Sequence, residues 1–311
     1  MAPRLQLVLF AMVACVTAVD LVWIQAGRFD VDGPAYGAMA LLAIGCAAGG
    51  LFYQCIRKDD RLAAMLMGTS FLLGMSASFS VLNYLLISVA GPRIDAPLAV
   101  IDRALGVDWP ALMGIAAEHP LLNGILQLVY VSVLPQIALL VIALGCYGKH
   151  ERIYSLCLAV AAGAAISIGV WAVAPSFGAF SVYELPADVA NRLALALDGD
   201  YAKSLIALLA HGPGHISPTA TKGLIGFPSY HAALALFVVW YARELAFVRW
   251  LVLVLNSIVL VATPIQGGHH VVDVLAGFVV TVLAILFSAW VVKLAARAGD
   301  ATTTAAQPAG I

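Results

Sequence analysis

The chain has 311 residues, of which 63% are hydrophobic and 11% are charged, and its formal net charge is −1. A soluble domain of this length carries about a quarter charged residues, so this composition excludes an ordinary water-soluble protein. Apolar runs of about 18 residues or more recur along the chain, each long enough to cross the hydrocarbon core of a bilayer. They predict an all-α, polytopic membrane protein.

Eight apolar runs predict a bundle of about eight transmembrane helices. In chain order they are residues 5–25, 35–56, 62–90, 121–146, 153–174, 229–247, 250–265 and 270–294. The first run follows Arg4 and could belong to a signal peptide, but it is long and no A-x-A cleavage site follows it, so we expect a retained helix. We divide the chain into two N-terminal accessory helices (1–60), a membrane-embedded core (61–297) and a disordered tail (298–311).

The positions of Lys and Arg predict the orientation of the chain in the membrane. Most of these residues flank the two termini and the short turns that follow the even-numbered spans. Both termini are therefore expected in the cytoplasm, with the loops 91–120 and 175–228 and the short loop Gln266–His270 facing outward. An amphipathic interfacial helix is expected within 91–120, and a short helix across Val189–Leu209.

Two polar segments lie at the start of two of the expected spans near the C-terminus. The segment GFPSYHAALALF opens the sixth span, and GGHHVVDVLAG opens the eighth. Two crossings separate these spans, so their N-termini must lie on the same side of the membrane. Two helix N-termini with free backbone N–H groups at one face suit a phosphate group.

The side chains of these segments suit phosphoryl chemistry. His269 and Asp273 are four residues apart and share a helix face, so Asp273 can hold one ring nitrogen and leave the other as a nucleophile or base. His231 can act as the general acid that protonates a leaving oxygen. Ser229 can donate a hydrogen bond to phosphate or merely cap its helix. Lys222 can supply a positive charge to the phosphate or be a solvated loop residue.

The segments FPSYH (Phe227–His231) and GGHHVVDVLAG (Gly267–Gly277) resemble the second and third motifs of the type 2 phosphatidic acid phosphatase superfamily, PSxH and (SR)xxxxxHxxxDxxAG. The resemblance covers about residues 150–294 and implies a six-helix phosphatase-type core. It implies that His269 attacks phosphorus to form a phosphohistidine, that Asp273 orients it, and that His231 protonates the leaving group, without a metal or other cofactor.

The chain departs from the superfamily pattern at two places. The first motif, KxxxxxxRP, is absent before the sixth span, and Thr263 stands where the third motif has arginine. Phosphate binding would then rely on Lys222, on helix dipoles and on Arg192 or Arg103. The form FPSxH is more similar to the branch that contains inositol phosphorylceramide synthase and sphingomyelin synthase, whose members transfer a phospho-headgroup between lipids.

Three functions are open on the sequence. The favoured one is an integral-membrane lipid phosphatase or phosphotransferase, with a membrane lipid as substrate, water or a lipid as acceptor, and no nucleic acid among its partners. We expect it in the bacterial cytoplasmic membrane with its site on the extracytoplasmic face. The alternatives are a transporter or proton-relay protein that uses the His/Asp cluster, and a metal site made of His231, His269, His270 and Asp273. Adjacent histidines on a helix point about 100° apart, which makes the metal site awkward.

Overall fold

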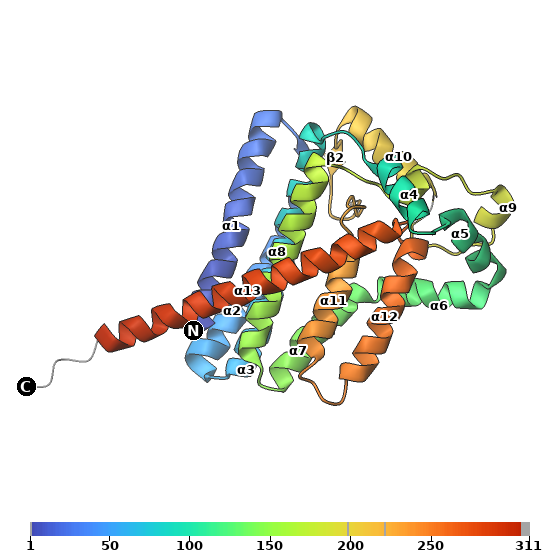
Figure 1. Ribbon diagram of the computed structural model, residues 1–311. Helices are drawn as coiled ribbons and strands as arrows, with labels where there is room; N and C mark the ends of the chain where they lie inside the picture. The colour runs from blue at the N-terminus through green and yellow to red at the C-terminus, as the bar shows by residue number, and fades with distance from the viewer. Residues whose placement is uncertain (1, 198, 221, 306–311) are drawn as a thin grey trace, which may run out of the picture.

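The computed structural model describes residues 2–197, 199–220 and 222–305, and most of them lie in helices (Figure 1). The α-helices are α1 (Ala2–Gly27), α2 (Gly33–Phe52), α3 (Asp60–Leu85), α4 (Asp95–Ala104), α5 (Trp109–Glu118), α6 (Pro120–Val131), α7 (Val133–Cys146), α8 (His150–Val173), α9 (Ala187–Ala190), α10 (Gly199–His211), α11 (Tyr230–Ala242), α12 (Arg249–Gln266) and α13 (Val271–Ala305). Three short helical turns and two short strands complete the described chain: η1 (Tyr53–Arg57), η2 (Leu86–Val89), η3 (Ala179–Ser181), β1 (Asp30–Val31) and β2 (His215–Ile216). The predicted all-α class is confirmed.

Six helical segments within the described residues are long and apolar enough to cross a membrane. They are α1, α2 with η1, α3 with η2, α8, α12 and the part of α13 up to Ala298, which match six of the eight expected spans. Their outer faces expose large apolar side chains such as Leu7, Leu41 and Leu286. Apolar surface of this extent on a polytopic bundle identifies an integral membrane protein. The last residues of the predicted disordered tail, 306–311, lie outside the described residues.

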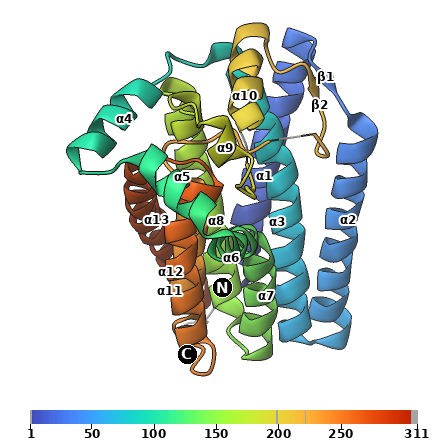
Figure 2. The ribbon, with the colours of Figure 1, turned by 90° about the vertical axis from the view of Figure 1, so that its right-hand side faces the viewer.

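The fourth expected span, residues 121–146, is not one straight helix. It is divided at Ser132 into α6 and α7, and the view in Figure 2 looks along α6 while α7 stands upright. Pro135, in the first turn of α7, has no N–H group, and its ring would clash with the carbonyl group four residues earlier in a continuous helix. The expectation of one continuous helix over residues 121–146 was therefore wrong. A second bend, of 112°, separates α5 from α6 at His119.

The sixth expected span, residues 229–247, is also shorter than predicted. Helix α11 has only 13 residues and ends at Ala242. In the turn that follows, the carboxylate of Glu244 pairs with Lys149, just before α8, and with Arg152 in the first turn of α8. These charged groups mark the end of the bundle opposite the long loops.

Each long loop contains two helices where one was expected. The loop 91–120 forms α4 and α5, and the loop 175–228 forms α9, α10 and strand β2. Strand β2 pairs in parallel with β1, with Val31 opposite Ile216, and so ties this loop to the connection between α1 and α2. The loops gather at one end of the bundle, beside the start of α13 (Figure 1).

Helix α8 lies at the centre of the bundle and packs against α3, α11 and α13. Small residues allow this close approach; a Cβ atom at Gly163, for example, would lie only 2.9 Å from the Phe237 ring of α11. The buried hydroxyl of Ser155 is 3.0 Å from that of Tyr241 and 2.8 Å from that of Ser288, and this network joins α8, α11 and α13. The core thereby fixes where α11 and α13 begin.

Candidate active site

The N-termini of α11 and α13 meet at one end of the bundle, as the parity of the spans predicted. The backbone N–H of Ser229, just before α11, donates to the carbonyl oxygen of Asp273 in the first turn of α13, at 3.0 Å. One turn further along α13, a Cβ atom at Gly277 would lie 2.7 Å from the carbonyl oxygen of Ser229. The two helices can approach this closely only because residue 277 is glycine.

His269 lies directly before α13 and its ring is held at one nitrogen. Nδ1 is 2.9 Å from the carbonyl oxygen of Gly226 and 3.3 Å from Oδ2 of Asp273. Since a carbonyl oxygen can only accept, Nδ1 carries the proton and Nε2 keeps its lone pair. Nε2 faces the hydroxyl of Ser229 at 3.5 Å, near the limit of a hydrogen bond. Asp273 is thus in contact with the ring, but the Gly226 carbonyl is the closer partner.

The ring of His269 is only 6% exposed. Burial disfavours the charged imidazolium and lowers the pKa of His269 to about 4, although the hydrogen bond to Gly226 opposes this shift. The ring is therefore neutral at pH 7, which is the form that can act as a nucleophile.

His231, in the first turn of α11, is fixed by Tyr130 from α6. The two rings stack with their centroids 4.0 Å apart, and Nε2 of His231 donates to the carbonyl oxygen of Tyr130 at 2.9 Å. Tyr130 is among the last residues of α6, where carbonyl groups lack a partner within the helix. The helix break at Ser132 therefore supplies an acceptor for His231 that was not apparent from the sequence.

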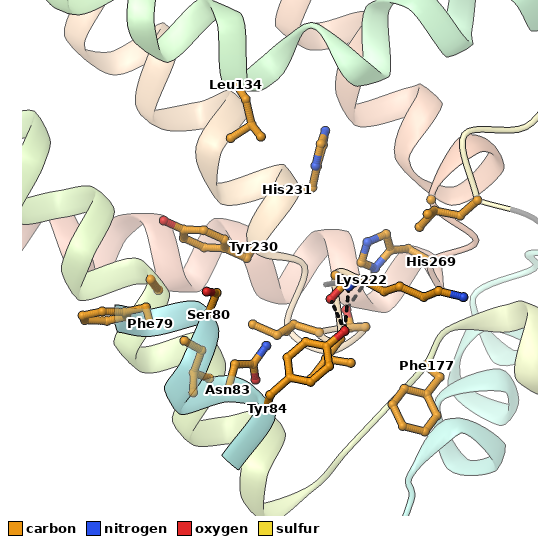
Figure 3. A pocket seen from close by; sticks show the side chains of 18 of the residues that line it. Phe79, Ser80, Asn83, Tyr84, Leu134, Phe177, Lys222, Tyr230, His231 and His269 are labelled. Carbon is orange, nitrogen blue, oxygen red and sulfur yellow. Dashed lines mark hydrogen bonds between the residues drawn. The ribbon is translucent and has the colours of Figure 1, made fainter. Parts of the chain in front are cut away.

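His231, His269 and Lys222 line one pocket with a volume of about 410 Å³, whose other wall is formed by α3 (Figure 3). The Lys222 ammonium group donates to Ser204 at 2.8 Å and lies 5.8 Å from the centre of the Tyr201 ring. Figure 3 shows the Lys222 side chain extended along the pocket wall, with Asn83 and Tyr84 of α3 nearby. The structure thus brings Lys222 into the pocket that contains both histidines.

Ser229 and the other expected cationic residues take different positions. The Ser229 hydroxyl is buried and caps α11 by accepting from the N–H of Ala232 at 3.3 Å, so it is a helix cap as well as a neighbour of His269. Arg103 and Arg192 do not line the pocket: Arg103 donates to Tyr183 on the surface, and Arg192 pairs with Asp188 in its own loop.

Two N–H groups at the start of α13 are already occupied by a carboxylate. Asp102 of α4 is buried and accepts from the backbone N–H of Val271 at 2.8 Å and of Val272 at 2.9 Å. The expectation that these N–H groups are free to bind phosphate is therefore wrong. The carboxylate stabilises the positive end of the helix and fixes the first turn of α13 next to His269.

A second carboxylate of α4 supports the turn that precedes His269. Oδ1 of Asp95 accepts from the backbone N–H of Phe177 at 2.7 Å and of Gly178 at 3.0 Å. The next residue, Ala179, donates its N–H to the carbonyl oxygen of Gly268 at 2.6 Å. Helix α4, expected to be an interfacial amphipathic helix, therefore builds part of the site.

His270 is fully buried and does not line the pocket. Its backbone N–H donates to Oδ2 of Asp273 at 2.8 Å, and its Nδ1 is 3.6 Å from Oδ2 of Asp102. Throughout the part of the chain that the structure describes, no three His, Cys, Asp or Glu side chains are placed to hold a metal ion.

One comparison with known proteins gives a match. The model of the PAP2 superfamily matches residues 96–287, more than half of the chain, from α4 into α13. The match thus begins well before residue 150, where the motif resemblance was expected to start, and it leaves α1, α2 and α3 outside. The chain matches no curated protein and no solved structure.

Proposed function

Because the chain belongs to the PAP2 superfamily, we propose that it is an integral-membrane lipid phosphatase or phosphotransferase that works through a phosphohistidine at His269. One observation carries the proposal. The ring of His269 is neutral and is held through Nδ1 by Gly226 and Asp273, while Nε2 points at the Ser229 hydroxyl beside a pocket that contains Lys222. A neutral, oriented imidazole next to a cation suits attack on a phosphate ester.

In the first step, the lone pair of Nε2 of His269 forms a bond to phosphorus, and the bond from phosphorus to the leaving oxygen breaks. His231 protonates that oxygen. Its Nε2–H is engaged by the Tyr130 carbonyl, so Nδ1 of the imidazolium is the nitrogen that delivers the proton. In the second step, water or a lipid hydroxyl attacks phosphorus, the N–P bond breaks, and His231 takes up the proton of the nucleophile.

The phosphate would be held by Lys222 and the Ser229 hydroxyl. Lys222 contributes the full positive charge in the pocket lining, and Ser229 can turn its hydroxyl from His269 to a phosphate oxygen. The motif form FPSxH favours headgroup transfer of the inositol phosphorylceramide synthase type over simple hydrolysis.

We further propose that a lipid substrate enters sideways from the bilayer and that the site faces the extracytoplasmic side of a bacterial cytoplasmic membrane. The Lys- and Arg-rich turns at the opposite end of the bundle support this orientation. Helices α1 and α2, which lie outside the family match, would be accessory to a core of residues 61–297.

The proposal is tested with purified protein and phosphatidic acid labelled in its phosphate, with and without an added lipid alcohol. Labelled phosphate should become bound to the protein in an alkali-stable, acid-labile form, and His269→Ala should lower turnover by about 10³-fold or more. His211→Ala, which removes an exposed histidine on α10, is the matched control and should retain turnover. Wild-type turnover in His269→Ala would refute the mechanism, whereas proton movement without any turnover would favour a proton-relay protein.

A further inference from the structure

A second cavity lies on the other side of α3 from the catalytic pocket. It has a volume of about 630 Å³ and is lined by α1, α2 and α3. Helices α1 and α2 both pack against α3, and Figure 2 shows α2 at the edge of the bundle with α3 beside it. The catalytic pocket uses Ser76, Phe79 and Ser80 of α3, whereas this cavity uses Gly74, Ala77 and Ser78. The two cavities are therefore separate.

The lining of this cavity is mostly apolar, with a few polar side chains (Thr17, Tyr36, Ser70 and Ser78), and its one acidic side chain is Asp20 of α1. Its apolar residues include Phe10, Val13, Ile24 and Phe71. Asp20 is only 4% exposed, and its Oδ1 has no hydrogen-bond partner among the described residues. A carboxylate within a membrane-spanning helix is costly unless it is paired, and such residues commonly mark a binding site or pathway.

The cavity is open toward the surroundings of the bundle. Leu21 of α1 and Ile44 of α2 line it, and they are 59% and 62% exposed. Both belong to membrane-spanning helices, so the opening between them faces the lipid. An amphiphile can therefore enter sideways, with its chain against the apolar wall.

We propose that this cavity binds a single-chain amphiphile with a protonated amine headgroup, whose ammonium group donates to the carboxylate of Asp20. Charge complementarity selects the amine: a cation satisfies the unpartnered Oδ1 of the carboxylate and neutralises the charge of Asp20. Asp20 lies seven residues before the end of α1 at Gly27, about 10 Å along the helix axis. The headgroup would thus lie deeper in the bundle than the β1–β2 pair, and its chain would extend along α1 and α3.

One side-chain contact joins a residue that lines this cavity to a residue that lines the catalytic pocket. Tyr36 of α2 lines the amphiphile cavity, and its hydroxyl is 3.2 Å from that of Ser80, which lines the catalytic pocket. The binding proposal itself does not depend on the proposed catalytic function.

The test uses photoactivatable hexadecylamine and hexadecanol, which have the same chain, in phosphatidylcholine nanodiscs that contain the full-length protein. Labelled peptides are identified by mass spectrometry at increasing mole fraction of each probe. Both probes should label α1, α2 and α3, and the amine should saturate at a mole fraction about tenfold lower than the alcohol. Asp20→Asn should remove this difference and leave the affinity for the alcohol unchanged.

A second variant keeps the proposal testable if Asp20→Asn does not fold. Gly37 of α2 lines the cavity, and a Cβ atom there would meet nothing within 4 Å, so Gly37→Leu places its side chain in open space and should reduce labelling by both probes. Gly45 also has open space but does not line the cavity, and Gly45→Leu is the matched control. Tenfold amine selectivity that persists in Asp20→Asn, or labelling unaffected by Gly37→Leu, would overturn the proposal.

Discussion

The carboxylate of Asp102 should be essential for placing His269, although it lies on a different helix. Asp102→Ala removes the acceptor for two partly buried N–H groups, those of Val271 and Val272, at 2.8 and 2.9 Å. Val271 is only two residues from His269. The variant should therefore loosen the first turn of α13 next to His269, the proposed nucleophile.

The size of the effect follows from the two lost hydrogen bonds. A fully buried donor left without a partner costs about 1–3 kcal/mol; the two donors here are only partly buried and cost about 1–2 kcal/mol each, so Asp102→Ala should cost about 2–4 kcal/mol of stability. A shift of the nucleophile by about 1 Å lowers turnover by about 10²-fold. Because Asp102 does not line the pocket, the loss should appear in kcat and leave KM nearly unchanged.

The assay compares apparent Tm and phosphatidic acid turnover for Asp102→Ala and for Asp108→Ala. Asp108 is the matched control: it is an exposed aspartate that caps its own helix, α5, through one hydrogen bond to Ala111 at 3.1 Å. Asp108→Ala should cost about 1 kcal/mol or less and retain turnover. Equal losses of Tm and equal turnover in the two variants would show that Asp102 does not position the site.

Three further predictions concern the site and its supports. Because burial lowers the pKa of His269 to about 4 in the folded protein, the unfolded state takes up a proton first as the pH falls through 6.5. The free energy of unfolding should therefore drop by about 2 kcal/mol between pH 7 and pH 5, as measured by thermal unfolding at both pH values. A drop of the same size in His269→Gln would contradict this prediction. Gly277→Val should lower both Tm and turnover, because its Cβ would lie 2.7 Å from the carbonyl oxygen of Ser229, just before α11. The control is Gly169→Val on α8, whose Cβ meets open space, and it should change Tm and turnover little. Similar losses of Tm and turnover in the two variants would refute the close-packing argument. Lys222→Ala should raise KM for phosphatidic acid by about tenfold. The control is Lys203→Ala, which removes an exposed lysine paired with a surface aspartate and should leave steady-state kinetics unchanged. An unaltered KM in Lys222→Ala would show that this residue does not bind the phosphate.

The parts of this structure that were predictable from the sequence depend on local patterns. The lengths of the apolar runs gave the helical class and six of the expected spans. The spacing of His269 and Asp273 placed both side chains together, and counting crossings placed His231 at the same end of the bundle. These properties require only the helical repeat and the thickness of a bilayer.

The parts that were missed depend on contacts between residues far apart in the chain. Asp102 is 169 residues from Val271, and Asp95 is 82 residues from Phe177. Both acidic residues looked like the polar face of an interfacial helix. The sequence nonetheless indicates that these carboxylates are buried. Asp95 and Asp102 lie on the same face of the helix as the apolar residues Leu98 and Ala99, and all four residues are buried in the structure.

The broken fourth span also has a consequence for proton chemistry. In an unbroken helix the carbonyl of Tyr130 would accept the N–H of residue 134, and no acceptor would remain for His231. The break at Ser132 leaves that carbonyl available, and its hydrogen bond stabilises the His231 tautomer with the proton on Nε2. The geometry of one helix thereby sets which ring nitrogen of a histidine on another helix carries the proton. A change that straightened the helix would alter the tautomer balance without replacing the histidine.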